Sequence, residues 1–436
     1  MTAMPMPLSP NRWHDRASLP APLLQIATAA TLLLPAMLLY GRGIADILLS
    51  GVAALFLLRC WIAAEWPGLR APWFRLAVVF WAWLLASSLW WGDTPAILQA
   101  LVMGRLLLFA LALEHWVLAP AAARRWLLWV IMAVAAWIAL ESWQQYLFGS
   151  NIAGYPRWSD GALTGPFKKP RAGGTYLVVF FPALLPLIMA WLGRPERWAR
   201  AGGVMLLAVG VATMVLIGQR MPTLLMVLGL LVSGLLLRRF RMPMLLAMLA
   251  GALLLAATPV VSPPTFQKLV LHFLDQMQHF VTSNYGLLYV RALVMLEAHP
   301  WLGLGFDGFR HACADPQYFH GLAWLGMSDQ QNGGLAGCNL HPHNYYMEAA
   351  TDGGVPGLLL FAGLVFVWLR RIARPLASGA TPLHVALFVA ALLALWPFAS
   401  SAALFVVPTA GWLFLMLGWG LADGSDRPPA IVIRAA

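Results

Sequence analysis

The chain has 436 residues, of which 61% are hydrophobic and 10% are charged, and its mean hydropathy is +0.74. This composition excludes a water-soluble globular protein. Because about 20 apolar residues cross a bilayer, the length accommodates about a dozen crossings and one sizeable extramembrane segment. The net charge of +11 would indicate nucleic-acid binding in a soluble protein. In a membrane protein it reflects topology, so we expect no nucleic-acid partner.

Twelve apolar runs predict an all-α polytopic membrane protein. They are rich in Leu, Ala, Val and Met and lack the period of two that β-barrel strands show. The first run follows Arg12 and Arg16 and shows no small-residue cleavage site, which predicts an uncleaved signal anchor. The runs cover about 22–40, 44–62, 74–91, 95–113, 126–147, 172–192, 201–217, 221–237, 243–261, 353–369, 382–398 and 402–421.

The distribution of Lys and Arg predicts the orientation, because basic residues near span ends stay in the cytoplasm. With the N-terminus inside, eighteen basic residues are on the inner side, nine are on the outer side, and Arg105 lies within a span. Both termini are therefore expected in the cytoplasm. The nine outer residues, candidates for binding an anionic ligand, are Arg42, Arg157, Lys168, Lys169, Arg171, Arg220, Lys268, Arg291 and Arg310.

Three regions are expected along the chain: helices 1–9 in residues 1–261, an outer loop in 262–352, and helices 10–12 with a tail in 353–436. The outer loop holds seven of the ten histidines and two of the three cysteines. Loops of this length are usually functional or disordered. Two helices are predicted in this loop, and the second runs from Asn284 to Glu297. The first opens at Pro263 and is amphipathic. Its apolar face has Phe266, Leu269, Val270, Phe273, Leu274, Met277 and Phe280, and its polar face has Gln267, Lys268, Asp275 and Gln278.

Two motifs in this loop have weak sequence support as ligand sites. The GxGxxG pattern at 303–308 follows no strand and lies in no βαβ unit, which favours a turn over a dinucleotide site. The cysteines and histidines between 311 and 343 fit no standard zinc spacing, so no metal or cofactor is expected. Cys313 and Cys338 either form a disulfide or stay free thiols, and the sequence leaves both open.

Two outer arginines have competing interpretations. Arg220 stands in a short turn between two apolar runs, where it either snorkels to the interface or binds phosphate through its planar guanidinium. Arg291 lies on a mostly apolar helix, where it either pairs with Glu297 or Asp275 or binds an anionic ligand.

The segment from His343 to Gly357 carries the most specific pattern: His-Asn, nine residues, Gly, two residues, Gly. It resembles the signature of the O-antigen ligase and polymerase superfamily, membrane glycosyltransferases that use undecaprenyl-pyrophosphate-linked glycans. Arg291 with the following 299–305 stretch, Arg220 and the large outer loop also match, and the resemblance covers about residues 150–360. The loop before residue 172 lacks the Asn that often follows its Pro in relatives.

The resemblance implies site residues. It implies that Arg220 and Arg291 bind the donor pyrophosphate and that His343 is the catalytic residue at the acceptor. His341, two residues earlier, need not face the same cavity. A lipid pyrophosphate leaves readily, so cations and one base suffice without a metal. The remaining residues of interest are the further phosphate contacts Lys168, Lys169 and Arg171, and the motif residues Asn344, Gly354 and Gly357.

The function that follows is transfer of O-antigen polysaccharide from undecaprenyl pyrophosphate to lipid A-core, in lipopolysaccharide biosynthesis. We expect an inverting, metal-independent enzyme without cofactor. It would be multi-pass in the Gram-negative inner membrane, with its site on the periplasmic face and membrane lipids around it. O-antigen polymerase or protein O-oligosaccharyltransferase activity remains open, as does transport of the lipid-linked glycan, although internal repeats typical of transporters are not seen.

Overall fold

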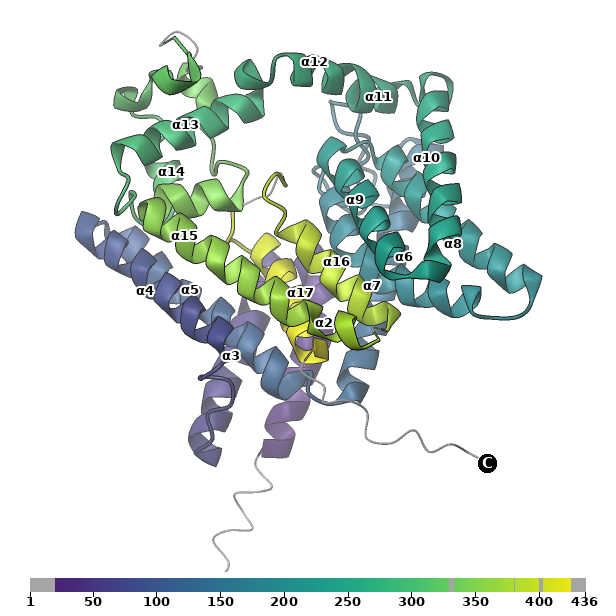
Figure 1. Cartoon of the computed structure of the whole chain (residues 1–436), viewed down its shortest axis with the longest axis horizontal. Coiled ribbons are helices and arrows are strands. Elements are labelled where there is room, and N and C mark those ends of the chain that lie inside the picture. The colour runs from purple at the N-terminus through teal and green to yellow at the C-terminus, as the bar shows by residue number, and fades with distance from the viewer. Residues whose placement is uncertain (1–19, 329–332, 380, 400–402, 425–436) are drawn as a thin grey trace, which may run out of the picture.

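The computed structural model describes residues 20–328, 333–379, 381–399 and 403–424 (Figure 1). It is 78% helical, and the described residues contain no β-strand, which confirms the all-α prediction. Arg12, Arg16 and both ends of the chain lie outside the described residues, so the signal anchor and the cytoplasmic termini stay predictions.

Each predicted apolar run overlaps a helix in the described part of the chain. Within the described part of the chain, nine helical segments are long and apolar enough to cross a membrane, while Arg220–Leu236 and Pro382–Ala394 are apolar but shorter. The chain is therefore a multi-pass α-helical membrane protein. The helices are α2 (Pro20–Tyr40), α3 (Arg42–Ala63), α4 (Pro72–Trp91), α5 (Thr94–Ala112), α6 (Ala121–Phe148), α7 (Ala172–Leu192), α8 (Arg197–Ile217), α9 (Arg220–Leu236), α10 (Arg241–Val261), α15 (Tyr345–Ala373), α16 (Pro382–Ala394) and α17 (Thr409–Gly424).

The last two helices depart from the predicted boundaries. The helix α16 ends at Ala394 and α17 begins at Thr409, whereas the apolar runs extend over 382–398 and 402–421. Pro397 and Pro408 explain the difference, because proline lacks an amide donor and disfavours helical geometry in the residue before it. Hydropathy alone does not detect such a helix end.

The helices form two groups with a shared centre. In Figure 1, α3 to α5 lie with α15 on one side, α6 to α10 lie on the other, and α2 lies near the middle with α17. The helix α4 packs against α5 and α15, and α7 packs against α6, α8 and α16. Between the groups, α17 contacts α5, α15 and α16. The core therefore joins the N-terminal and C-terminal thirds of the chain.

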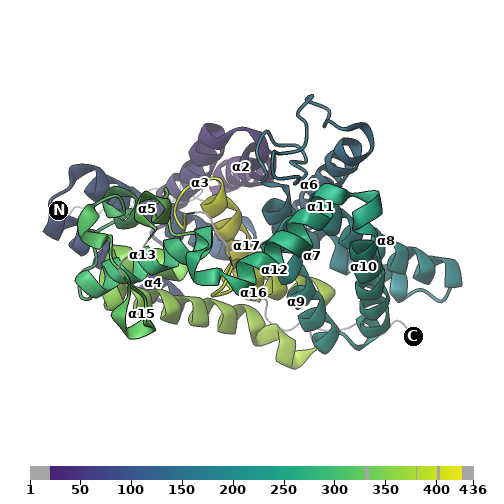
Figure 2. The same ribbon diagram turned by 90° about the horizontal axis from the view of Figure 1, so that it is seen from above.

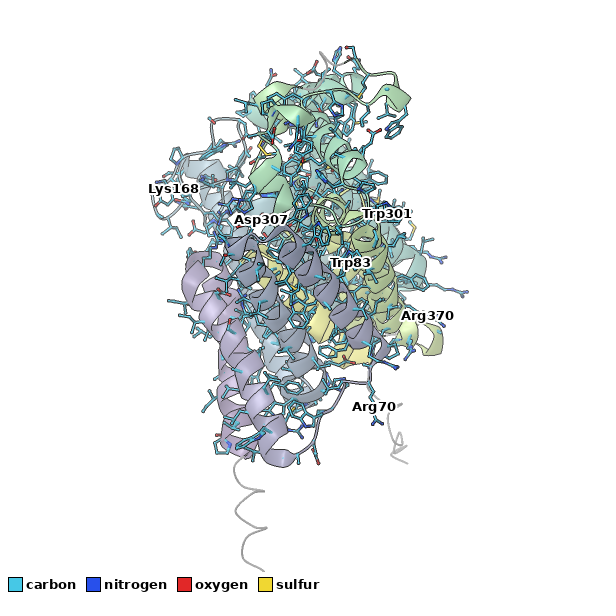
Figure 3. All side chains as sticks on the ribbon, turned by 90° about the vertical axis from the view of Figure 1, so that its left-hand side faces the viewer. Arg70, Trp83, Lys168, Trp301, Asp307 and Arg370 are labelled. Carbon is cyan, nitrogen blue, oxygen red and sulfur yellow. A yellow bond between two sulfur atoms is a disulfide. The ribbon has the colours of Figure 1, made fainter. Side chains whose placement is uncertain are left out.

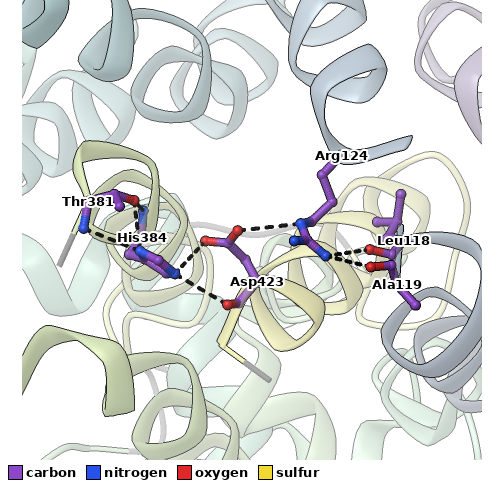
Figure 4. Close-up of polar contacts among 6 residues, drawn as sticks. All are labelled: Leu118, Ala119, Arg124, Thr381, His384 and Asp423. Carbon is purple, nitrogen blue, oxygen red and sulfur yellow. Dashed lines mark hydrogen bonds and ion pairs between the residues drawn. The ribbon is translucent and has the colours of Figure 1, made fainter. Parts of the chain in front are cut away.

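Charged residues separate between the two ends of the molecule. Figure 3 shows Arg70 and Arg370, both of the predicted inner set, at one end, and Lys168, of the outer set, toward the other with Asp307. At the inner end, Asp423 lies 3.6 Å from Arg124 Nε and 3.1 Å from His384 Nε2, which ties α6, α16 and α17 together (Figure 4). We call the end that carries Lys168 and Asp307 the outer end.

The outer end is covered by a helical segment that links α10 to α15. Its elements are α11 (Pro263–Phe266), a π-helical turn (Gln267–Leu271), α12 (His272–Gln278), α13 (Asn284–Ala298) and α14 (Gly308–Ala312). In Figure 1, α11 and α12 cross from one helix group to the other, and Figure 2 shows them from above. The predicted helix that opens at Pro263 is confirmed, as is the one at Asn284.

The faces of the first of these helices differ from the prediction. Lys268, expected on the polar face, is 9% exposed and pairs with Asp160 of the α6–α7 loop (residues 149–171). Leu274 and Met277, expected on the apolar face, are 53% and 56% exposed. A π turn holds more residues than an α turn, so it rotates the following residues out of the regular helical register. The amphipathic pattern assumed an uninterrupted α-helix.

Candidate functional site

A cavity of about 500 Å³ opens at the outer end of the helix bundle. Its walls are mostly apolar and come from α7, α9, α16, α17 and the segment between the last two; they include Leu177, Val178, Met221, Leu225, Leu393, Trp412 and Met416. Its polar lining residues are Arg42, Arg171, Asp307, Arg310, His341 and Tyr345. An amphiphilic ligand with an anionic head and an apolar chain matches this lining.

Two helix N-termini flank the cavity. At the start of α7, Pro170, Arg171, Gly174 and Thr175 line it, and at the start of α9, Met221 does. The two ends are close, because a Cβ on Gly173 would lie 2.4 Å from Gln219 Oε1, and the Gln219 side-chain amide donates to Pro170 O. Helix N-termini present free amide donors and a positive dipole end, so they favour bound phosphate.

Arg220 begins α9 but does not line the cavity; its neighbour Met221 does. The Arg220 guanidinium donates to the carbonyl of His272, 3.1 Å away, and to the side chain of Gln276. Both acceptors belong to α12. In this structure, therefore, Arg220 links α12 to α9 through hydrogen bonds.

Arg291 lies in the core of the outer segment, at 0% exposure. Its guanidinium donates to Cys313 O and to Gly334 O at 2.9 Å, and it stacks on Phe319 with 4.2 Å to the ring centroid. Burial lowers the pKa of this guanidinium. Arg291 is therefore separate from the residues that line the cavity.

The two histidines of the 341–343 stretch lie in contact. Their ring centroids are 4.4 Å apart, and the His343 ring also meets Tyr285 at 5.6 Å. His343 has a φ of +56°, and its Nε2 lies 3.4 Å from Asn339 Nδ2. His341 lines the cavity and His343 does not, so the two histidines do not face the same cavity.

Burial keeps His341 neutral. Its pKa falls to about 4, mainly because burial disfavours the charged ring, and the nearby His343 and Arg310 lower it further. Its Nε2 is buried and has no hydrogen-bond partner among the described residues. This nitrogen therefore has free hydrogen-bonding capacity at the wall of the cavity.

Asn344 caps the helix that the motif begins. Its side chain accepts from the amides of Tyr346 and Met347 at 2.9 and 3.2 Å, and its amide donates to Pro397 O at 2.7 Å. The cap explains why α15 begins at Tyr345 rather than at about residue 353. It also fixes the backbone directly after His343.

The glycines of the motif allow a kink in α15, and the GxGxxG turn packs against this kink. Gly354 interrupts α15 with a φ of +66°, and a Cβ there would lie 2.5 Å from Trp301 O. Gly303 approaches the same backbone, while a Cβ on Gly357 would lie 2.7 Å from Ala349 O. The GxGxxG stretch is thus a packed turn, as predicted. It docks through Leu304 N to Thr351 O at 2.8 Å and Gly305 N to Asp352 O at 3.0 Å.

Asp307, which the sequence did not single out, and Arg310, one of the nine outer basic residues, reach the cavity through this turn. The Asp352 carboxylate accepts from the amides of Asp307 and Gly308 at 3.2 and 3.0 Å. Asp307 has a φ of +60° and lies 3.4 Å from Arg310 Nη1, and burial raises its pKa. Arg42 also lines the cavity, and its outer position was the only sequence signal for it.

Lys168 and Lys169 line a second cavity, of about 490 Å³, together with Arg171. Arg171 belongs to the walls of both cavities, so the two adjoin. The α6–α7 loop forms this cavity together with the end of α2, and the role of the three cations as phosphate contacts stays a prediction.

The zinc interpretation fails for the cysteines, because Cys313 and Cys338 form a disulfide and offer no thiolate. The described residues contain no group of three or more His, Cys, Asp or Glu arranged to hold a metal ion. Of the two states that the sequence left open for these cysteines, the structure has the disulfide.

Comparison with known proteins finds a family resemblance in the middle of the chain. Residues 204–362 match the family model described as O-antigen ligase. The matched range runs from α8 into α15 and contains Arg220, Arg291 and His343. No curated protein matches the chain significantly. The chain is therefore similar to the O-antigen ligase family over residues 204–362, about a third of its length.

Proposed function

We propose that the protein is an O-antigen ligase of the Gram-negative inner membrane. It transfers the polysaccharide from undecaprenyl pyrophosphate to lipid A-core at the periplasmic face, which is the outer end of the bundle. The family match and the membrane-crossing helices support this proposal. The observation that carries it is the first cavity, whose apolar walls and cationic lining suit a lipid pyrophosphate.

The donor would place its lipid chain against α7, α9 and α17 and its diphosphate among the cations. Arg171, Arg310 and the two helix N-termini supply charge-assisted hydrogen bonds to phosphate oxygens. Arg220 adds a further hydrogen bond if its guanidinium leaves the Gln276 side chain and donates to a phosphate oxygen instead. The same role for Arg291 requires the backbone at Cys313 and Gly334 to move, because these carbonyls enclose its guanidinium.

The reaction is a single displacement. The acceptor hydroxyl oxygen attacks the anomeric carbon, the bond from that carbon to the diphosphate oxygen breaks, and His343 takes the hydroxyl proton. This role requires the His343 ring to turn into the cavity, which His341 lines in this structure. The developing negative charge on the diphosphate is stabilised by arginines, which act without a divalent ion. Attack from the face opposite the leaving group inverts the anomeric centre.

The test is transfer by purified protein with lipid-linked donor and three acceptors: lipid A-core, a second lipid-linked repeat, and an acceptor protein. Product on lipid A-core alone, unchanged by EDTA, is the expected result. Product only on the second repeat or on protein would show a polymerase or a protein glycosyltransferase. Donor movement across vesicles without any product would show a transporter. Activity lost in EDTA and restored by one divalent ion would contradict the metal-independent mechanism.

Replacement of Arg310 tests the cavity itself. Arg310→Gln should weaken donor binding, whereas Arg238→Gln removes the same charge from the turn before α10, where no cavity residue lies. Equal donor affinity in the two variants would exclude the first cavity as the diphosphate site.

A further inference from the structure

The α6–α7 loop presents three exposed cations at the second cavity. Lys168, Lys169 and Arg171 are exposed and have no ion-pair or side-chain hydrogen-bond partner among the described residues. Other outer cations are engaged: Lys268 pairs with Asp160, and Arg310 with Asp307. Three uncompensated charges within four residues repel one another and attract an anionic ligand.

Buried amides hold this loop in one shape. Gln145 is 0% exposed, donates to Tyr155 O and Thr164 Oγ1 at 2.9 Å, and accepts from Thr164 N at 2.7 Å. Asn151 is 3% exposed and donates to Gly165 O at 2.7 Å. The backbone that carries the cations is thus organised before any ligand arrives, which lowers the entropic cost of binding.

The same cavity has surfaces suited to sugar rings. Tyr40 and Tyr155, whose side chains are 61% and 37% exposed, line it with Phe167. Each tyrosine combines an apolar ring with a hydroxyl that hydrogen-bonds. Cations beside tyrosines match an oligosaccharide that carries phosphate groups better than a bare phosphate ion.

We propose that this second cavity binds the phosphate-bearing sugars of the acceptor and delivers its hydroxyl to the adjoining first cavity. The inference rests on the proposed ligase function. Arg171 lines both cavities, so an acceptor bound to Lys168 and Lys169 lies beside the donor diphosphate. An anionic phospholipid headgroup offers the same phosphate chemistry and is the competing source.

The kinetic test compares phosphorylated acceptor with acceptor whose core phosphates have been removed. Wild-type protein should show a lower KM for the phosphorylated form. In the double variant Lys168→Gln and Lys169→Gln, the KM for the phosphorylated form should rise about tenfold or more, since charge-assisted hydrogen bonds are lost. Its preference for that form should then disappear. The matched control, Arg238→Gln with Arg239→Gln, removes two exposed charges at the start of α10 and should keep the wild-type preference.

Direct binding separates this inference from the proposed function. Titration of the delipidated, phosphorylated core oligosaccharide into purified protein should show binding that the double lysine variant loses. Binding without transfer would support the cavity and contradict the ligase function. Transfer with equal KM values for both acceptors, or no oligosaccharide binding, would overturn the inference. Binding of phosphatidylglycerol micelles that the oligosaccharide does not displace would assign the cations to the membrane and overturn it too.

Discussion

His341 and His343 lie with their ring centroids 4.4 Å apart, and only His341 lines the first cavity. The histidine of the sequence motif thus lies next to a neutral, partly buried histidine that forms the cavity wall. The pair links the cavity to Tyr285 and Asn339, which contact His343. Separate replacements of the two rings therefore have different expected effects.

His343→Ala should lower turnover by about 10² to 10⁴-fold, the scale of a positioned acid or base, and leave donor affinity nearly unchanged. His341→Ala should reduce turnover less, because it removes a neutral wall residue. Transfer rates and donor affinities of both folded variants test this. If His341→Ala abolishes transfer and His343→Ala does not, the cavity-lining histidine is the base.

Stability should depend on the protonation of His341. The pKa of this ring is about 4 in the folded chain, below the ordinary histidine value of about 6.5, mainly because the ring is buried. Between these values only the unfolded chain binds the proton, so stability is lost as pH falls from about 6.5 to about 4. The midpoint of thermal unfolding should fall less steeply over this range in His341→Gln. The matched control is His311→Gln, whose ring is 47% exposed; an equal slope in all three proteins would refute the assignment.

Gly354→Ala should destabilise the protein strongly. Its φ of +66° is strained for alanine, and the added Cβ would lie 2.5 Å from Trp301 O. Gly363→Ala, in the same helix, places its Cβ 3.7 Å from Leu76 and should be neutral or stabilising by up to about 1 kcal/mol. Thermal unfolding in detergent measures both. Equal midpoints for the two variants would contradict the kink.

Asp352→Ala should cost about 1–3 kcal/mol for each buried amide that it leaves unsatisfied, those of Asp307 and Gly308. Asp352→Asn keeps one carbonyl oxygen and should cost less. Because the turn carries Arg310 to the cavity, Asp352→Ala should also weaken donor binding. Unfolding midpoints and donor titration decide this, and an unchanged midpoint for the alanine variant would be inconsistent with the observed bonds.

Reduction of the Cys313–Cys338 disulfide should destabilise the outer segment. The two cysteines are 25 residues apart, and chain entropy alone gives such a cross-link about 3 kcal/mol. Dithiothreitol should lower the unfolding midpoint of the wild type but not that of the variant with serine at both positions. Since Cys313 O binds Arg291, donor affinity should fall with reduction if Arg291 serves the donor.

The sequence determined the fold class and the positions of the helices. Hydropathy is a local property, and about twenty apolar residues favour a helix in a bilayer whatever their neighbours are. The His343–Asn344 pattern also indicated the family before any packing was known. The cap that Asn344 forms needs only the residues that follow it.

Tertiary structure alone decided which side chains meet. Arg42, Arg171, Arg310 and His341 come from four distant segments, and the walls of the cavity depend on how α7, α9, α16 and α17 pack. The same packing encloses Arg291 in the outer segment, while the π turn buries Lys268. A sequence pattern reports which residues share a helix face. It does not report which helices become neighbours, because that depends on side-chain packing between segments remote in the chain.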